Sequence, residues 1–381
     1  MDFNLTEEQQ AFASSVRSFA ETHLSAGALE RAHSAHYPWD VARLLGSNGL
    51  LGITLPTSSG GQGGTLMDAV IAIQELASVC PKSADVAQAG NFGAIRTFAD
   101  YAGPELRERY LPQLLAGDEL IGLGMSEPDA GSALTELATS ARADGESYIV
   151  DGTKVFSTNS GDATLFLVYV RFGPGPSGIG SVAVARATPG LTIGPPSRFM
   201  SGEQWHELSF DGCRIPRENL VLGPGGFKRQ MGDFNVERIG NAARSLALGR
   251  YAFNYARAYA LTRKQFGRPL CEFQGLQWKF ADMAVTLEAA QLLLYRAAVN
   301  ADRGLPSAYD TAIAKAAANL AGFGVSNEAL QVMGGLGYGE DTLVEYCVRR
   351  TRGFMIAGGS IEMMKNRIAE SLFERRFSQR I

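Results

Sequence analysis

The hydrophobic pattern of the chain changes twice, and this order constrains the fold more than any single motif does. Apolar residues recur at roughly helical spacing through residues 1–119 and again in long, almost proline-free segments after residue 226. The intervening residues 120–226 carry β-branched and aromatic runs separated by glycines and prolines. We therefore expect an α+β protein with an N-terminal helical domain (1–119), a central β-domain (120–226) and a C-terminal four-helix-bundle domain (227–381).

Local signals indicate where some of these elements begin and turn. Thr6 and Gln9 have the spacing of a capping box at the start of the first helix. The dipeptides Asp151-Gly152 and Asp211-Gly212 predict tight hairpin turns, because such turns need the positive φ that glycine allows. The longest helices are expected at residues 230–265, 274–303 and 308–333.

Composition and charge exclude several classes of protein. The net charge is -4 and no Lys/Arg-rich block is present, which disfavours binding to nucleic acid. The N-terminal residues lack the basic start and apolar run of a secretory signal, and no apolar stretch is long enough to span a bilayer. We therefore expect a soluble cytoplasmic protein with no membrane partner. The four cysteines stand far apart, which predicts free buried thiols and no metal site.

Five segments spread over nearly the whole chain form the most specific signal. In chain order they are 123–132, 151–159, 263–274, 331–335 and 357–362. Together they resemble the acyl-CoA dehydrogenase family, whose members oxidise acyl thioesters at Cα–Cβ with FAD. The resemblance implies that FAD lies between the β-domain and the C-terminal bundle and that an electron-transfer flavoprotein takes up the electrons. It also implies a homo-oligomer, with a homotetramer expected ahead of a homodimer.

The resemblance also assigns residues to the flavin ring. The loop with Met125, Ser126 and Ser132 would contact the flavin, with the backbone of the first two holding the pyrimidine end. Phe156 would pack on the ring. Thr158 would hydrogen-bond near the flavin N5, where such a bond stabilises negative charge on the reduced ring.

Three further groups match the family's contacts to the ADP half of FAD. Arg263, Phe266 and Gln274 match positions that act across a subunit boundary, where arginine offers a planar fork of donors to a pyrophosphate. The other two groups are loops in which glycine lets the backbone approach phosphate closely. The residues concerned are Gln331, Gly334, Gly335, Gly359, Ser360 and Glu362. The family commonly has glutamine at the last of these positions, so a carboxylate there should face the ribose or adenine.

The catalytic base is expected at an alternative position. Much of the family has a glutamate directly before the Gly-Ser of the last motif, but this chain has Gly358 there. A subset similar to isovaleryl-CoA dehydrogenases carries the base before an arginine on the first helix of the C-terminal bundle. Glu237 and Arg238 match that pair. The resemblance thus implies that Glu237 is the base, that the Gly358 N–H serves the oxyanion hole, and that Asn235 and Arg238 contact the arm of the thioester.

The residues around Asp85 predict the class of acyl group. The segment after Cys80 contains no arginine, and an aspartate among small residues would repel an anionic acyl group. We therefore expect a neutral short, branched or cyclic acyl group, with Arg96 as the one nearby cation that could change this.

Three other functions stay open. The acyl group could be attached to a carrier protein instead of coenzyme A, and the chain could be an inactive FAD-binding scaffold. The third alternative is a lyase, because residues 37–40, 55–58 and 272–278 resemble 3-sulfinopropionyl-CoA desulfinases. A desulfinase that transfers no electrons needs no glutamate at position 237, and it does need an arginine for its acidic substrate. These two points favour the dehydrogenase.

Overall fold

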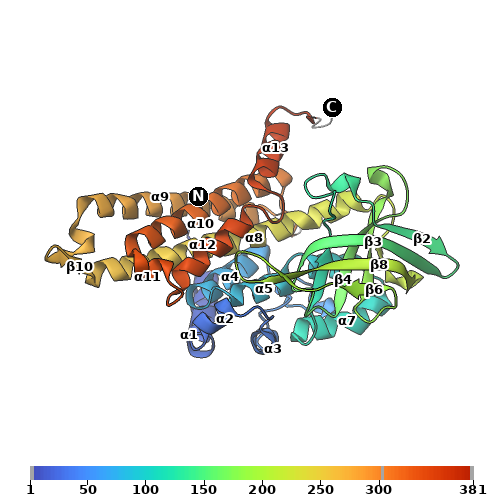
Figure 1. The fold of residues 1–381 in the computed structure, drawn as a ribbon, viewed down its shortest axis with the longest axis horizontal. Coiled ribbons are helices and arrows are strands. Elements are labelled where there is room, and N and C mark those ends of the chain that lie inside the picture. Colours follow the sequence, from blue (N-terminus) through green and yellow to red (C-terminus); the bar gives the residue numbers. More distant parts are fainter. Residues whose placement is uncertain (1–3, 302–303, 378–381) are drawn as a thin grey trace. The chain divides into compact units, whose positions relative to one another are not determined.

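The computed structural model describes residues 4–301 and 304–377, and they form two compact units. The bundle unit comprises the residues up to His33, then Thr65–Asp85 and the chain from Asn235 onward. The sheet unit comprises Ser34–Gly64 and Val86–Phe234. Both units combine segments that are distant in sequence (Figure 1).

The sheet unit is built on a nine-stranded mixed sheet with the order β6-β8-β3-β2-β4-β5-β9, in which β1 also pairs with β4 and β7 with β8. The β1–β4 and β2–β4 pairs are parallel, and the other pairs of this sheet are antiparallel. The strands are β1 (Ile121–Gly124), β2 (Ser140–Asp144), β3 (Ser147–Thr158), β4 (Leu165–Arg171), β5 (Ile179–Ala185), β6 (Leu191–Ile193), β7 (Ser197–Arg198), β8 (Gln204–Pro216) and β9 (Leu220–Leu222).

Helices α6 (Ala94–Tyr101) and α7 (Pro104–Ala116) supply much of the core that covers this sheet. Phe98 and Tyr110 from these helices pack with Leu167 and Tyr169 of the sheet in one cluster of buried side chains. Strand β4 is buried at six of its seven positions, which explains why its sequence is apolar without alternation. The unit also contains α3 (Trp39–Ser47).

The hairpin turns expected at Asp151-Gly152 and Asp211-Gly212 are wrong. Both dipeptides lie inside continuous strands, β3 and β8, at a point where the register of the two strands shifts. Gly212 has a φ of 56° and donates its N–H to Asp151 Oδ1 at 2.7 Å. Glycine is therefore used here to form a β-bulge, in which one strand has an extra residue. The turn that joins β2 to β3 lies at Gly145, with a φ of 58°.

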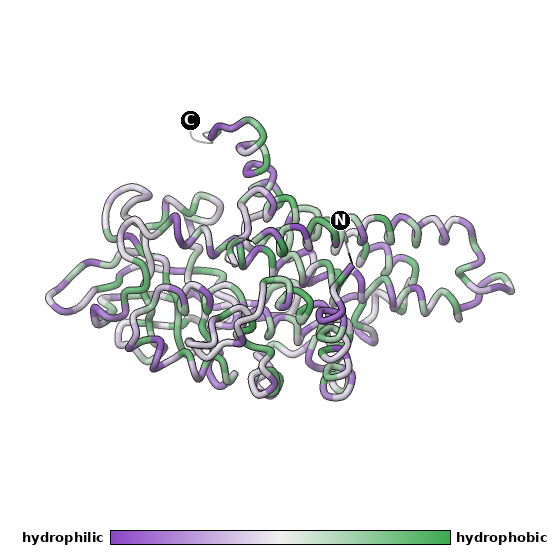
Figure 2. Tube along the Cα trace, turned by 180° about the vertical axis from the view of Figure 1, so that it is seen from behind, coloured by the Kyte–Doolittle hydropathy of each residue, from purple (hydrophilic) through white to green (hydrophobic). Residues whose placement is uncertain are grey.

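The bundle unit consists of long helices packed side by side, with apolar and polar positions alternating along them (Figure 2). Gly249 and Gly322 lie where α8 and α10 approach closely, since a Cβ on Gly322 would lie 2.3 Å from the Ser245 carbonyl oxygen. The helices are α1 (Glu7–His23), α2 (Ala28–His33), α4 (Leu66–Val79), α8 (Phe227–Thr262), α9 (Gln274–Val299), α10 (Ala308–Met333), α11 (Gly335–Tyr338), α12 (Leu343–Phe354) and α13 (Ile361–Leu372). Helix α8 begins in the sheet unit, and α5 (Ser83–Asn91) has residues in both units.

Two expectations from the sequence are confirmed. The capping box at Thr6 and Gln9 is present, and the order of helices, strands and helices is the expected α+β arrangement. Contacts divide the N-terminal helical segment between the two units, so the boundaries at 119/120 and 226/227 stay predictions. No helix in the described part of the chain is both long and apolar enough to cross a membrane. All four cysteines are free, and Cys271 is only partly buried.

Candidate active site

In the sheet unit, the loop after β1 is held by a buried ion pair. Lys154 on β3 donates to Glu127 Oε1 at 2.7 Å and to the Met125 carbonyl oxygen at 3.2 Å. Glu127 also accepts backbone N–H bonds from Ala138 and Thr139 at 2.5 and 2.9 Å. Burial lowers the pKa of Lys154 to about 8 even though Glu127 raises it. Glu127 and Lys154 lie in the family-like segments 123–132 and 151–159. Their role in holding the Met125 carbonyl group is seen only in the structure.

A second β-bulge in β3 exposes an aromatic side chain beside this loop. Phe156 has a φ of 58°, which is rare for a bulky residue, and its side chain is 57% exposed. Its ring centroid lies 4.7 Å from that of Trp205 on β8. Val155 next to it donates its N–H to the Ser126 carbonyl oxygen at 2.8 Å, and Thr158 at the strand end is exposed. The structure therefore brings the Met125–Ser126 loop against β3, the strand that also carries Phe156 and Thr158.

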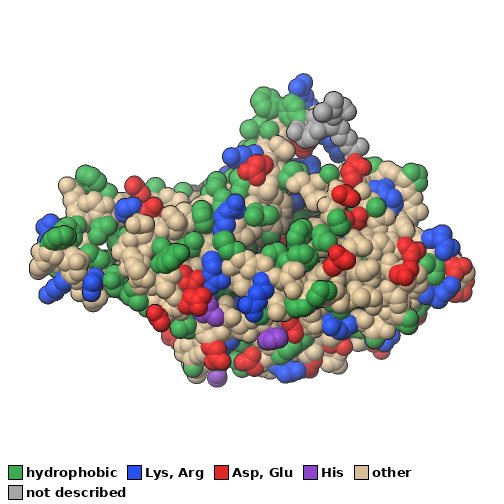
Figure 3. All heavy atoms as spheres, viewed as in Figure 1, with side chains coloured by type: hydrophobic (Ala, Val, Ile, Leu, Met, Phe, Trp, Pro, Cys, Tyr) green, Lys and Arg blue, Asp and Glu red, His purple; other side chains and the backbone are tan. Residues whose placement is uncertain are grey.

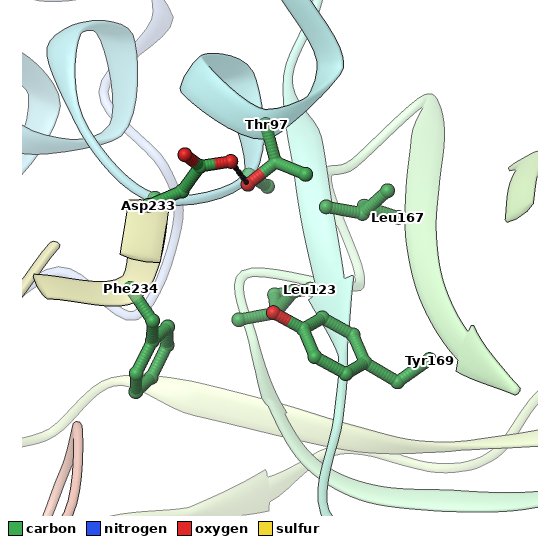
Figure 4. A pocket seen from close by; sticks show the side chains of 8 residues that line it. Thr97, Leu123, Leu167, Tyr169, Asp233 and Phe234 are labelled. Carbon is green, nitrogen blue, oxygen red and sulfur yellow. Dashed lines mark hydrogen bonds between the residues drawn. The ribbon is translucent and has the colours of Figure 1, made fainter. Parts of the chain in front are cut away.

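The sheet unit also contains a small, mostly apolar cavity of about 10 Å³, with room for about one water molecule (Figure 4). At its wall the Thr97 hydroxyl donates to Asp233 Oδ2 at 3.1 Å. Burial raises the pKa of Asp233 to about 6, although hydrogen bonds from Thr97 and Tyr101 favour its charged form. Asp233 was not among the expected functional residues, since its environment depends on helix packing. The residues labelled in Figure 4 are Thr97, Leu123, Leu167, Tyr169, Asp233 and Phe234.

In the bundle unit, one arginine joins the start of α8 to the loop between α12 and α13. Arg238 donates from Nε to the Gly358 carbonyl oxygen and from Nη1 to Asn235 Oδ1, both at 2.9 Å. Gly358 has a φ of 73°, which glycine adopts readily. Glu237 is half-buried on the same turn of α8. The structure thus groups Asn235, Arg238 and Gly358, and the assignment of Glu237 as the base stays a prediction.

The same loop leads into the N-terminus of α13. Ser360 is its N-cap and accepts a hydrogen bond from the Met363 N–H at 3.4 Å. Glu362 is fully exposed in the first turn, and its pKa is lowered by its own backbone N–H and by Ser360. Free N–H groups at such a helix start suit a phosphate, which is consistent with the expected role of Gly359 and Ser360.

In the bundle unit, Asp85 is paired with two arginines. Its Oδ1 accepts from Arg244 Nη1 at 2.7 Å and from Arg350 Nη2 at 3.0 Å. Burial alone would raise the pKa of Asp85, but Arg350 and Arg244 hold it well below its usual range. The two arginines are 159 and 265 positions away in sequence, so no local pattern could identify them. Arg96, the cation considered from sequence, is paired with Asp100 at 2.7 Å.

The remaining predicted residues lie at other places in the bundle unit. Arg263, Phe266 and Gln274 surround the hairpin of β10 (Lys264–Gln265) and β11 (Arg268–Pro269), where Phe266 is 93% exposed. Basic side chains are visible around this hairpin at the end of the bundle (Figure 3). A second set, made up of Gln331, Gly334 and Gly335, is exposed where α10 ends.

Comparisons with known proteins identify the family of the chain. Sequence models of the acyl-CoA dehydrogenase N-terminal, middle and C-terminal domains match residues 6–118, 122–213 and 224–373. The chain is 35% identical to a 3-sulfinopropanoyl-CoA desulfinase of Paraburkholderia xenovorans, with 99% of both chains covered. It is 34% identical to the short-chain specific acyl-CoA dehydrogenase of Clostridium acetobutylicum, covering 98% of this chain and 100% of the relative.

A solved structure extends the likeness to three dimensions. The butyryl-CoA dehydrogenase of Megasphaera elsdenii matches with a TM-score of 0.91 and 33% identity, covering 98% of this chain and 100% of that one. The chain therefore belongs to the acyl-CoA dehydrogenase family, and it is an oxidoreductase of the class that acts on CH–CH bonds.

Proposed function

We propose that this protein is an FAD-dependent dehydrogenase that forms a Cα–Cβ double bond in an acyl-CoA thioester, with Glu237 as the base. The observation that carries the proposal is the 2.9 Å hydrogen bond from Arg238 Nε to the Gly358 carbonyl oxygen. It ties the turn of α8 that bears Glu237 to the loop where the usual glutamate is replaced by glycine. A carboxylate from α8 can therefore serve a thioester bound at this loop.

The residues of the site divide the reaction between them. The Gly358 N–H donates to the thioester carbonyl and stabilises negative charge on its oxygen, which makes the α-proton more acidic. Glu237 takes that proton as general base. When bound, FAD supplies the acceptor for the hydride that leaves Cβ. The electrons then pass to an electron-transfer flavoprotein, and the product is the α,β-unsaturated thioester.

The exposed surfaces of both units suit FAD. In the sheet unit, Phe156 and Trp205 form an aromatic surface beside the Met125–Ser126 loop, where an isoalloxazine ring can pack. In the bundle unit, a Cβ added to Gly334 or Gly335 would meet no atom within 4 Å, so the backbone there is open to a phosphate. The residues that would hold FAD are Met125, Ser126, Ser132, Phe156, Thr158, Gly359, Ser360 and Glu362, with Arg263, Phe266, Gln274, Gln331, Gly334 and Gly335 completing the ADP site.

The acyl group is proposed to be neutral and short, branched or cyclic, now for a different reason. Arg96 binds the carboxylate of Asp100 in the sheet unit, and Arg244 and Arg350 bind that of Asp85 in the bundle unit. An anionic acyl group beside Asp85 would have to displace this carboxylate from its arginines or remain without a cationic partner, which costs several kcal/mol. The carrier is proposed to be coenzyme A.

Anaerobic bleaching of the enzyme-bound flavin by a panel of thioesters tests this function. We expect isobutyryl-, isovaleryl- or cyclohexanecarboxyl-CoA to reduce the flavin faster than glutaryl-CoA does. Faster reduction by glutaryl-CoA would refute the neutral acyl group. Reduction only by carrier-protein thioesters would change the carrier and keep the chemistry.

A desulfinase-like lyase is the second candidate, because its relatives match the chain over nearly its full length and Gly358 replaces the usual base. The two candidates differ in electron transfer. Release of sulfite from 3-sulfinopropanoyl-CoA without flavin bleaching, together with no bleaching by the panel, would replace the dehydrogenase with the lyase.

A further inference from the structure

A lysine in the middle of α10 is fully buried beside the loop that carries Gly358. The side chain of Lys315 is 0% exposed. Its Nζ donates to the Phe354 carbonyl oxygen at 3.1 Å and to the Gly359 carbonyl oxygen at 2.9 Å. Phe354 is the last residue of α12, and Gly359 immediately precedes the N-cap of α13. One ammonium group therefore joins the two ends of the 355–359 loop.

Two other side chains hold the same loop by its carbonyl groups. Asn319, one helical turn after Lys315, donates to the Phe354 carbonyl oxygen at 2.6 Å and to Asn241 Oδ1 at 2.9 Å. Arg238 holds the Gly358 carbonyl oxygen from α8. Since each peptide group is planar, fixing these oxygens limits how the N–H groups between them can turn. The loop is thus positioned by donors from α8 and α10.

Lys315 and Arg238, the neighbour of Glu237 on α8, bind adjacent carbonyl oxygens of the same loop, those of Gly359 and Gly358. Burial, together with the positive charge of Arg238, lowers the pKa of Lys315 to about 7, although Glu237 acts to raise it. The interaction with Glu237 is mutual, so a protonated Lys315 favours the ionised carboxylate that proton abstraction requires. A hypothetical Cβ on Gly358 would lie 3.3 Å from Lys315 Cε, which places the lysine directly behind this glycine.

We propose that Lys315 is a positioning residue that clasps both ends of the 355–359 loop, so that the Gly358 N–H faces the thioester carbonyl, and that it places a positive charge beside Glu237. This inference rests on the proposed function. It separates into two measurable parts. The two hydrogen bonds that Lys315 donates, here called the clasp, limit the mobility of the loop. The charge of Lys315 affects the pH at which the Glu237 carboxylate becomes ionised.

The clasp is tested on the full chain by hydrogen–deuterium exchange of the loop's backbone amides, detected by mass spectrometry. Lys315→Met removes the donors and the charge at nearly the same length. We expect the amides of the loop to exchange about tenfold faster in this variant, since two buried hydrogen bonds are lost. Unchanged protection of the loop in the variant would overturn the clasp. This readout does not depend on activity or on the cofactor.

The charge is tested by the rate at which a saturating acyl-CoA exchanges its α-proton with solvent deuterium, followed over pH. In Lys315→Met we expect the rate to fall about 10²-fold, the loss typical of one misplaced oxyanion donor, with a smaller change in KM. We also expect the acidic side of the profile to move to higher pH. Lys315→Gln keeps a hydrogen-bond donor but has no charge. Its exchange rate should therefore fall less than that of Lys315→Met, while the acidic side of its pH profile should move by the same amount.

A comparison variant separates geometry from charge. Asn319→Leu removes a donor to the Phe354 carbonyl oxygen without changing any charge, so it should loosen the loop and leave the pH profile in place. If both Lys315 variants keep the wild-type profile and KM, the lysine is only structural and the proposal is wrong. A third outcome separates this proposal from the proposed function. If Lys315→Met speeds amide exchange in the loop but the wild-type protein exchanges no α-proton of the acyl-CoA, the role of Lys315 in holding the loop stands. The catalytic role of its charge and the proposed function would then both be wrong.

Discussion

Asp233 shows how strongly packing changes a single residue of the sheet unit. Thr97 donates to one of its oxygens at 3.1 Å and Tyr101 lies 3.5 Å from the other. These two bonds do not offset the loss of solvent, because the pKa rises from 3.8 to about 6. A carboxyl group with a raised pKa binds its proton more tightly in the folded protein than in the unfolded chain, so stability falls as pH rises between these two values.

Asp233→Asn should therefore stabilise the protein above about pH 6. The amide keeps an acceptor for Thr97 and has no charge to bury, so we expect a gain on the order of 2 kcal/mol in the free energy of unfolding at pH 7.5. The gain should disappear below about pH 4, where the wild-type carboxyl is neutral in both states. Urea denaturation at the two pH values measures this difference, with Asp211→Asn, an exposed aspartate, as the control. An equal effect at both pH values would contradict the account.

Elements with a strong local pattern could be predicted from the sequence, and bulges could not. Helix α10 occupies the predicted residues 308–333 because its apolar spacing and its Ser307 cap act locally. The Asp151-Gly152 and Asp211-Gly212 dipeptides have the local chemistry of turns, yet they face each other across β3 and β8. Whether glycine closes a hairpin or forms a bulge depends on the partner strand, which the dipeptide does not contain.

The residues of the candidate site were likewise predictable only where they belong to a contiguous motif. The resemblance identified the segments around Met125, Phe156 and Gly358, because these are contiguous motifs. It did not identify the side chains that hold them, namely Lys154 behind Met125 and Lys315 behind Gly358, since each acts through a contact distant in sequence. The partners of Asp85 were missed for the same reason.

The length of α8 determines which residues one bound cofactor can reach. Arg238 and Thr262 are 24 residues apart on a helix that runs from Phe227 to Thr262, which corresponds to roughly 36 Å at 1.5 Å per residue. The β10–β11 hairpin with Arg263 and Phe266 therefore lies far along the bundle from the Gly358–Ser360 loop (Figure 1). This separation supports a hairpin that serves the FAD of another subunit.

At the scale of the whole molecule, we predict a homotetramer in which FAD binding and assembly are linked. Arg263→Ala should weaken FAD binding, with loss of at least about 1.5 kcal/mol for a charge-assisted hydrogen bond to phosphate. Light scattering on line with size-exclusion chromatography, with absorbance recorded for flavin, measures both properties on one sample. Arg257→Ala, also exposed near the end of α8, is the matched control. A monomer that retains FAD at high dilution would contradict the prediction.

The central claim is that Glu237 removes the α-proton, and stopped-flow measurement of flavin reduction in Glu237→Gln tests it most directly. The amide keeps the shape of the side chain and removes its basicity, so FAD content and thioester binding should be retained. We predict that flavin reduction by the best acyl-CoA substrate slows by about 10²–10⁴-fold, as expected for loss of a general base. Reduction at the wild-type rate would contradict the account and place the base elsewhere.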